Sequence, residues 1–445
     1  MAGFVLRGDI CHSVSEKRIQ AVKDGFLVCE DGLSQGVFRE LPERFAGLRR
    51  LDFTGELIIP GLTDLHTHAS QYAIASEGLD MELIDWLNAC TFPEESRFSD
   101  MGYARAVYGA FASELRRGAT TRACVFATVH PRATLELMRV LDSTGLVTMA
   151  GKVSMDRNSP AALTERGPER ALKNAAEWLE RASDFKNTYP ILTPRFIPAC
   201  SDALMRGLAG LRERYDLPVQ SHLSENRAEV EWVRRLCPES RSYGGAYLSR
   251  GMFGGDVRTV MAHCVWCTEE EADLLAARGV FIAHCPQSNV NLSSGIAPAR
   301  AFIARGARMG LGTDVGAGCH LSVFRAMTDA VQASKLYNLY VDGARPPLTF
   351  AEAFYLGTAG GGRFFGKVGS FEPGYEFDAV VINYGAPRPN NTPSVPSINS
   401  PGDAPLVPFA SSPDEPGIIK RLTKAAYLSD DRHIRAKFVR GVRLF

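Results

Sequence analysis

The chain has 445 residues, and its 50 basic and 50 acidic side chains balance at a sequence pI near 7.1. This length suits one large α/β unit with a smaller unit beside it, and the balanced charge argues against a nucleic-acid surface or a polyanionic substrate. The N-terminal segment lacks the long apolar core of a signal peptide. The sequence also has no uninterrupted run of about 18 apolar residues, the length that would predict a membrane span.

The first 58 residues contain short alternating segments, broken by Gly and Asp, that predict β-strands joined by turns. After Pro60, apolar strands alternate with amphipathic helices, which is the pattern of a parallel α/β unit. Eight such strands predict a distorted (β/α)8 TIM barrel over residues 59–366. The expected strands lie near Leu62–His66, Thr120–Ala127, Leu146–Ser154, Ile191–Ala199, Pro218–His222, Thr259–Cys264, Val280–His284 and Met309–Thr313.

The clearest helix prediction is the segment SDMGYARAVYGAFASELRRG. Ser99 or Asp100 is expected to cap its start, and Gly118 is expected to end it. Its apolar stripe has four-residue spacing and should face the core; the stripe comprises Tyr103, Val107, Phe111 and Leu115.

Beyond residue 366 the pattern becomes β-like again, and DDRHIRAKFVRGVRLF predicts a final hairpin. We expect the two ends of the chain to pair into one small β-sandwich domain, formed by residues 1–58 and 367–445. Residues 385–417 are rich in proline and serine and cannot build a regular core, so they predict a surface insertion.

The segment PGLTDLHTHASQYA places His66 and His68 one residue apart at the end of an apolar run. Residues i and i+2 of a strand face the same side, so both imidazoles could bind one metal ion. Taken alone, a His-x-His pair more often consists of two hydrogen-bonded or surface histidines.

The ends of the other predicted strands favour the metal over that alternative. Because the active site of a (β/α)8 barrel lies at the C-terminal ends of its strands, side chains there should share one site. Five of the nine histidines of the chain occupy such ends. Besides the first pair, these ends carry His222 with Glu225, His263, His284 and Asp314.

Three histidines and one carboxylate suit a Zn²⁺ ion with one position left for water. The metal can lower the pKa of that water from about 15.7 to near 7. Hydrolysis also requires proton transfer, for which Glu225 and Asp314 are the candidates.

The set HxH, HxxE, H and D on an eight-stranded pattern resembles the amidohydrolase superfamily. Six segments narrow the resemblance to the guanine deaminases, a zinc-dependent aminohydrolase branch of that superfamily. They are PGLTDLHTHASQYA, LIDWLNACTFPEE, TPRF, QSHLSENRAEVE, AHCPQSNVNLSSG and GLGTDVGAG. The similarity runs from about residue 50 to residue 380 and resumes in YLSDDRHI.

The resemblance implies conversion of guanine and water to xanthine and ammonia, by attack of zinc hydroxide on C2 of the purine. His263 would hold the attacking water or the substrate, and Glu225 and Asp314 would shuttle protons. A cytoplasmic homodimer is also implied. The single zinc ion per chain would be bound by His66, His68, His222 and Asp314.

The implied substrate-binding residues surround the purine. Gln71 and Arg195 would recognise its polar edge, and Phe196 would flank the ring. The ligands His68 and His222 would also contact the substrate.

Several residues keep open interpretations. Cys264 follows His263 where the family leads us to expect glycine, and the proline-rich insertion is also outside the family pattern. His284 is expected to orient a ligand or a loop, and His320 could touch the substrate. Lys152 could instead be a carbamylated bridge between two metals, although the HxxE motif favours one metal.

The ten cysteines are scattered, which favours reduced thiols in a cytoplasmic protein over a disulfide framework. The single CxxC, formed by Cys264 and Cys267, has no second pair and is interpreted as coincidental.

The alternative enzyme is a related amidohydrolase that deaminates another purine, a pterin or an s-triazine. The alternative outside catalysis is a binding or scaffold protein on the same barrel, which would be expected to lack metal ligands. A zinc deaminase of the cytidine type is excluded, because it requires H-x-E and P-C-x-x-C motifs.

Overall fold

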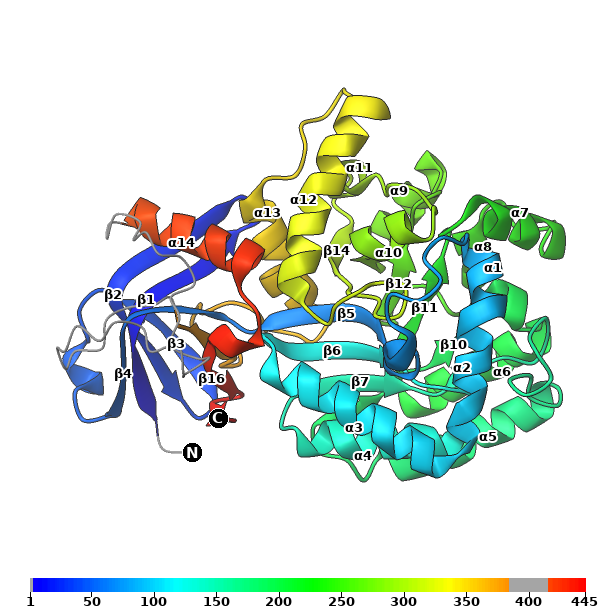
Figure 1. The fold of residues 1–445 in the computed structure, drawn as a ribbon, viewed down its shortest axis with the longest axis horizontal. Coiled ribbons are helices and arrows are strands. Elements are labelled where there is room, and N and C mark those ends of the chain that lie inside the picture. The colour runs from blue at the N-terminus through cyan, green and yellow to red at the C-terminus, as the bar shows by residue number, and fades with distance from the viewer. Residues whose placement is uncertain (1–2, 384–414) are drawn as a thin grey trace.

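The computed structural model describes residues 3–383 and 415–445 of the chain. A mixed β-sheet built from both ends of the chain lies beside a larger α/β unit built from its middle (Figure 1). Helices cover the strands of the α/β unit, whereas the blue N-terminal and red C-terminal strands meet in the mixed sheet. The α/β class expected from the sequence is confirmed.

Seven strands form the mixed sheet in the order β17-β16-β15-β4-β1-β2-β3. β1 and β4 are parallel, and the other neighbouring pairs are antiparallel. The expected final hairpin is present, since Val439 pairs with Val442. The described strands form this single sheet, and the two-sheet packing of a sandwich stays a prediction. The strands are β1 Phe4–Ser15, β2 Arg18–Glu30, β3 Leu33–Phe38, β4 Arg49–Pro60, β15 Ala379–Ile382, β16 Ile434–Val439 and β17 Val442–Arg443.

The strands of the α/β unit form two four-stranded parallel sheets, β5-β6-β7-β9 and β11-β12-β13-β14, and a short parallel pair of β8 with β10. They are almost wholly buried, as expected for parallel strands covered by helices. The strands are β5 Leu62–His68, β6 Thr120–Phe126, β7 Val147–Gly151, β8 Val153–Ser154, β9 Thr188–Pro190, β10 Thr193–Pro194, β11 Val219–Leu223, β12 Thr259–His263, β13 Phe281–His284 and β14 Arg308–Leu311.

Two of the predicted strands differ in the structure. The third, Leu146–Ser154, is divided into β7 and β8. The fourth, Ile191–Ala199, is wrong, because β9 ends before it, β10 covers only two of its residues, and a 3-10 helix at Ile197–Ala199 closes it. The prolines at positions 190, 194 and 198 explain the difference, since proline has no N–H to donate to a strand ladder.

Fourteen α-helices are found among the described residues, and α3 shows why the longer ones were predictable. Asp100 caps α3 by accepting a hydrogen bond from the Gly102 N–H at 2.7 Å. The predicted stripe faces the core through Val107, Phe111 and Leu115, all of which are buried. The helices are α1 Leu83–Trp86, α2 Phe92–Ser96, α3 Met101–Arg117, α4 Pro131–Ser143, α5 Pro168–Ala182, α6 Asp202–Tyr215, α7 Arg227–Leu236, α8 Tyr243–Leu248, α9 Glu269–Ala277, α10 Pro286–Asn291, α11 Ala299–Ala304, α12 Val323–Tyr340, α13 Phe350–Tyr355 and α14 Glu415–Leu428.

Helix α14 corrects the end of the predicted insertion. Residues 385–414 of the insertion lie outside the described residues, but residues 415–417 already belong to α14. The helix crosses the mixed sheet (Figure 1) and buries Ile418, Leu422 and Ala425, which share one helical face.

Two buried basic side chains join the mixed sheet to the α/β unit. Arg122 of β6 donates to both oxygens of Asp378, at 2.6 and 2.8 Å, and to Glu376 at 2.9 Å. The fully buried Lys437 of β16 donates to the carbonyls of Leu115 and Thr120, at 3.2 and 2.9 Å. Because buried polar and charged groups are stable only when hydrogen-bonded or paired, these contacts fix the sheet against β6 and the end of α3.

No helix in residues 3–383 or 415–445 combines the length and the apolarity that crossing a bilayer requires.

Candidate metal centre and active site

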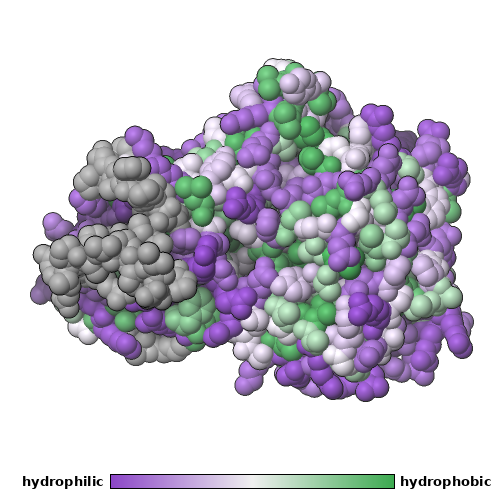
Figure 2. All heavy atoms as spheres, viewed as in Figure 1, coloured by the Kyte–Doolittle hydropathy of each residue, from purple (hydrophilic) through white to green (hydrophobic). Residues whose placement is uncertain are grey.

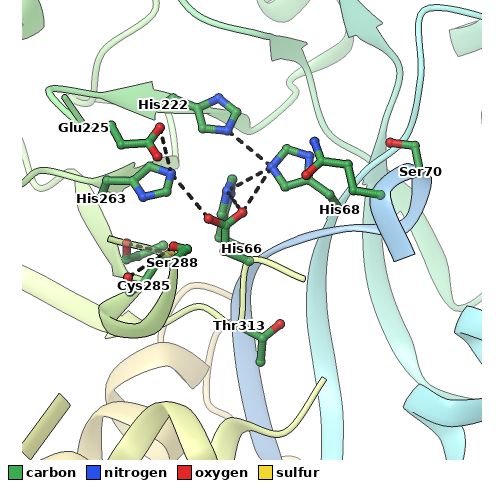
Figure 3. Close-up of polar contacts among 12 residues, drawn as sticks. His66, His68, Ser70, His222, Glu225, His263, Cys285, Ser288 and Thr313 are labelled. Atoms are coloured by element: carbon green, nitrogen blue, oxygen red, sulfur yellow. Dashed lines mark hydrogen bonds and ion pairs between the residues drawn. The ribbon is translucent and has the colours of Figure 1, made fainter. Parts of the chain in front are cut away.

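Figure 3 shows His66, His68 and His222 pointing toward one another, and Asp314 completes this group of four side chains from three strand ends. His66 and His68 come from β5, His222 comes from β11, and Asp314 follows β14. The Nε2 atom of His68 lies 3.2 Å from Nε2 of His66 and 3.3 Å from Nε2 of His222. One oxygen of Asp314, Oδ1, lies 3.1 Å from Nε2 of His66 and 3.3 Å from Nε2 of His68.

All four side chains are buried, so their nitrogens and oxygen cannot turn to water. Burial, followed by the neighbouring histidines, holds the pKa of His68 and of His222 well below the ordinary value, which favours neutral imidazoles with lone pairs. Burial alone would raise the pKa of Asp314, but His66, His263 and His68 outweigh it and hold that pKa well below its usual range. Neutral imidazoles and an ionised carboxylate are the donors that a divalent metal ion requires.

Contacts behind these side chains fix their orientation. The Nδ1 of His222 lies 2.6 Å from the carbonyl oxygen of Arg195. A carbonyl only accepts, so Nδ1 carries the proton and Nε2 presents a lone pair to the centre. Asp64 ties β5 to the residues after β14, because its Oδ1 accepts from the backbone N–H groups of His66 and Thr313, each at 3.1 Å.

His263, at the end of β12, lies near the second carboxylate oxygen of Asp314, away from the oxygen that contacts His66 and His68. Its Nε2 lies 3.9 Å from Asp314 Oδ2 and 3.4 Å from Glu225 Oε2. Its Nδ1 lies 2.9 Å from Oδ1 of Asn289, so Nε2 is the nitrogen that faces the centre. His263 can therefore belong to a metal-binding group with His66 and His222, or hold a water molecule beside the metal.

Glu225 is buried beside His263, just beyond β11. Burial, the neighbouring Glu229 and Asp314 raise its pKa well above the ordinary value. Glu229 is itself held in place by the Glu225 N–H at 2.9 Å and the Tyr243 hydroxyl at 2.7 Å. Glu225 can thus keep a proton at a pH where an exposed glutamate has lost it.

A cavity opens beside this centre. Trp86, Leu87, Phe196 and Leu292 form apolar walls around the polar groups. Such a pocket suits a flat heterocycle, whose faces pack on apolar side chains while its edge meets polar ones.

Gln71 and Arg195, which were predicted to recognise the polar edge of the purine, both line this cavity. They are joined by Glu95 of α2, which accepts from Gln71 Nε2 at 3.0 Å and from Arg195 Nη1 at 2.5 Å. No role was predicted for Glu95. The available signal was its position in TFPEE, within a segment that carries the family resemblance.

Four residues near the centre have backbone φ angles in the left-handed region. The φ angles are 50° at Ser224, 73° at His263, 53° at Cys264 and 48° at Asp314. Glycine, which the family resemblance led us to expect at this position, would adopt the Cys264 conformation freely. Cysteine pays roughly 1–2 kcal/mol for it, so the departure changes strain rather than any proposed ligand.

The remaining candidates lie outside the cluster. His284 is buried at the end of β13, and burial lowers its pKa to about 4, whereas His320 is exposed and does not line the cavity. Lys152 pairs with Glu165 at 2.9 Å, which gives it a partner other than a metal. Cys264 and Cys267 are both free thiols.

Comparison with known proteins places this chain among close relatives. A family model for the amidohydrolase family matches residues 57–444. The guanine deaminase of Mus musculus is 36% identical over 98% of this chain and 96% of that protein, and the guanine deaminase of Dictyostelium discoideum is 33% identical over 99% and 98%. A solved guanine deaminase from C. acetobutylicum, with guanine bound in its active site, has a TM-score of 0.90 and 39% identity over 100% of both chains.

The converging side chains predict a metal content that depends on each of them. His66→Ala removes one donor and should lose most of the bound metal, as measured by elemental analysis after dialysis. His320→Ala is the matched control and should keep the wild-type content. A His66→Ala protein that retained the full metal content would contradict the proposed centre.

Proposed function

We infer that this chain, which belongs to the amidohydrolase family and within it to the guanine deaminases, converts guanine and water to xanthine and ammonia. The observation that carries the inference is the meeting of a His/Asp metal-binding cluster with two polar side chains at one apolar cavity. The guanine deaminase relatives match this chain over nearly its whole length, so the catalytic unit they share is present here.

We propose zinc as the metal, with one ion per chain, because three imidazole nitrogens and a carboxylate match its preferred donors. When bound, zinc supplies a Lewis acid that lowers the pKa of a water molecule from about 15.7 to near 7. The proposed ligands are His66, His68, His222 and Asp314.

The chain's own groups then divide the work of binding. Phe196 and Trp86 would hold the faces of the ring, while Arg195 and Gln71 meet its polar edge. His68 and His222 would contact the base on the metal side.

Glu225 and Asp314 are the proposed proton carriers, together with His263. Their opposite pKa directions separate the roles: Glu225 is the acid that gives a proton to N3 of guanine, and Asp314 is the base that takes one from water. His263 would hold that water between them. A C–O bond forms at C2, and Asp314 would pass its proton to the amino group, which leaves as ammonia when the C–N bond breaks. The remaining hydroxyl proton at C2 would return to Glu225, which gives the carbonyl of xanthine and restores the acid.

We also propose that the two parallel sheets close into one (β/α)8 barrel over residues 59–366, with residues 1–58 and 367–445 forming a β-domain. Two contacts support closure. Leu192 bridges to Val219 of β11, and the Asp314 N–H donates to the His66 carbonyl at 2.8 Å. A cytoplasmic location is proposed from the ten cysteines, all of which are free thiols.

A homodimer is proposed from an apolar patch at the end of α12. Leu339, Tyr340 and Val341 are 69%, 80% and 62% exposed. Figure 2 shows hydrophobic residues gathered at this upper end of the molecule. An exposed apolar patch is typical of a protein interface.

The dimer predicts that Tyr340→Asp, which places a charge in the patch, shifts the protein from dimer to monomer in sedimentation velocity. Glu180→Gln, on the surface of the remote helix α5, should leave the dimer intact. Wild-type protein that sediments as a monomer at micromolar concentration would contradict the dimer.

The activity is tested by incubating the purified, zinc-loaded protein with guanine. Equal amounts of xanthine and ammonia are expected. Ultraviolet absorbance measures the xanthine, and an ammonia assay measures the ammonia. Adenine, a pterin and an s-triazine serve as competing substrates. Turnover of one of these heterocycles without turnover of guanine would assign the chain to another substrate.

Glu225→Gln keeps the size of the side chain but removes the acid, so kcat should fall at least about 10²-fold. Elemental analysis should show an unchanged metal content, because Glu225 is not a proposed ligand. Glu231→Gln, on the exposed side of α7, should behave as wild type. Near-normal turnover by Glu225→Gln would assign the proton transfer to Asp314.

A further inference from the structure

Glu95 is a buried carboxylate that lies outside both the proposed metal-binding group and the lining of the cavity. It lies on α2 and is 1% exposed. Each of its oxygens has one partner: Oε1 accepts from Gln71 Nε2, and Oε2 accepts from Arg195 Nη1. A buried carboxylate is stable only with such partners, so its position and those of Gln71 and Arg195 depend on one another.

The contact with Glu95 decides which end of the Gln71 amide faces the substrate. The nitrogen and oxygen of an amide have nearly the same shape, and a free glutamine could present either. A carboxylate accepts and does not donate, so Nε2 must point to Glu95. The carbonyl oxygen Oε1, on the other arm of the amide, is then the atom left for the ligand.

Arg195 is held in the same way. One nitrogen of its guanidinium donates to Glu95, and the group lies 5.3 Å from the centre of the Phe92 ring. The guanidinium has five donor hydrogens and no acceptor, so its remaining nitrogens can only donate to a ligand. Together, the two side chains present a ligand with one hydrogen-bond acceptor, the Gln71 carbonyl oxygen, beside the N–H donors of Arg195.

This pattern is complementary to guanine, which carries an N1–H donor beside the O6 acceptor. A purine with a 6-amino group reverses the pattern, since its N1 accepts and its amino group donates. To fit such a base, the Gln71 amide would have to turn over, and its oxygen would then face the Glu95 carboxylate. Two acceptors in a buried contact leave both without a hydrogen, which is strongly unfavourable.

We propose that Glu95 is a positioning residue that sets substrate specificity, because it locks the Gln71 amide with its oxygen toward the purine and holds the Arg195 fork beside it. The proposal rests on guanine being the substrate. Glu95 acts through its two neighbours and therefore determines which purine edge is accepted.

The test uses 2,6-diaminopurine, which has the reversed edge but keeps the 2-amino group that leaves. Wild-type enzyme should strongly prefer guanine, by a factor of kcat/KM that can reach about 10⁴. Glu95→Gln has nearly the same shape, but its amide can donate as well as accept, so Gln71 is free to turn over. We expect this variant to lose activity on guanine and to shift the guanine to 2,6-diaminopurine ratio at least about tenfold toward 2,6-diaminopurine.

Two control variants separate specificity from folding. Glu94→Gln changes the neighbouring buried glutamate, whose partners are Arg97 and Tyr103, and should keep the wild-type ratio even if stability falls. Glu95→Asp keeps a group that only accepts, so the ratio should stay within about threefold of wild type even where the rate falls. Metal content and thermal unfolding identify variants that do not fold.

A Glu95→Gln enzyme whose two rates fall by the same factor would overturn the proposal, because a merely structural role predicts an unchanged ratio. If Glu95→Gln does not fold, Gln71→Met provides the test from the other side of the contact. It removes the acceptor, so the ratio should again move toward 2,6-diaminopurine, and an unchanged ratio would overturn the proposal. Wild-type enzyme inactive on guanine would instead overturn the proposed function and this inference with it.

Discussion

The crowding of three imidazole nitrogens and one carboxylate oxygen, at separations of 3.1 to 3.3 Å, is the constraint on which the remaining structure depends. Lone pairs placed so closely in a buried site are favourable when a cation lies among them. The chain meets this constraint by bringing three strand ends together, and Asp64 maintains the approach of β5 to the residues after β14. Left-handed residues at these ends, such as Asp314, turn the side chains inward at some cost in backbone strain.

The proposed metal centre and the cavity beside it share one short segment of chain. The Arg195 carbonyl oxygen orients His222, while the Arg195 guanidinium lies at the cavity beside Gln71. A shift of this backbone would therefore move a proposed metal ligand and a proposed substrate contact together. The segment is anchored because the Ser221 hydroxyl donates to the Pro194 carbonyl oxygen at 2.6 Å. Such coupling explains why an irregular segment, rather than a long strand, can serve at this point of the fold.

The parts of the fold and site that could be predicted from sequence are those determined by local pattern. Helix α3 follows from its apolar stripe and its aspartate cap, and the positions of His66 and His68 follow from strand alternation. The division of β7 from β8 depends on tertiary pairing, which the sequence pattern does not contain. The apolar residues of the segment 191–199 suggested a strand, but the prolines within and beside that segment interrupt it. Helix α14 escaped prediction because its apolar face lies directly after a proline-rich segment. Glu95, Asp64 and Asn289 escaped it because their roles exist only in contacts between distant parts of the chain.

The buried pairing of Arg122 with Asp378 and Glu376 affects the order in which the protein can form during synthesis. Strand β6 leaves the ribosome more than 250 residues before these carboxylates, and β4 must likewise wait for β15. Until then, a nascent chain holds an unpaired cation that keeps β6 from being buried, and an exposed apolar strand edge of the kind that promotes aggregation. The early half of the α/β unit therefore gains its last contacts only when the C-terminal residues have been made. A truncated chain lacks these contacts and is less stable than the finished protein.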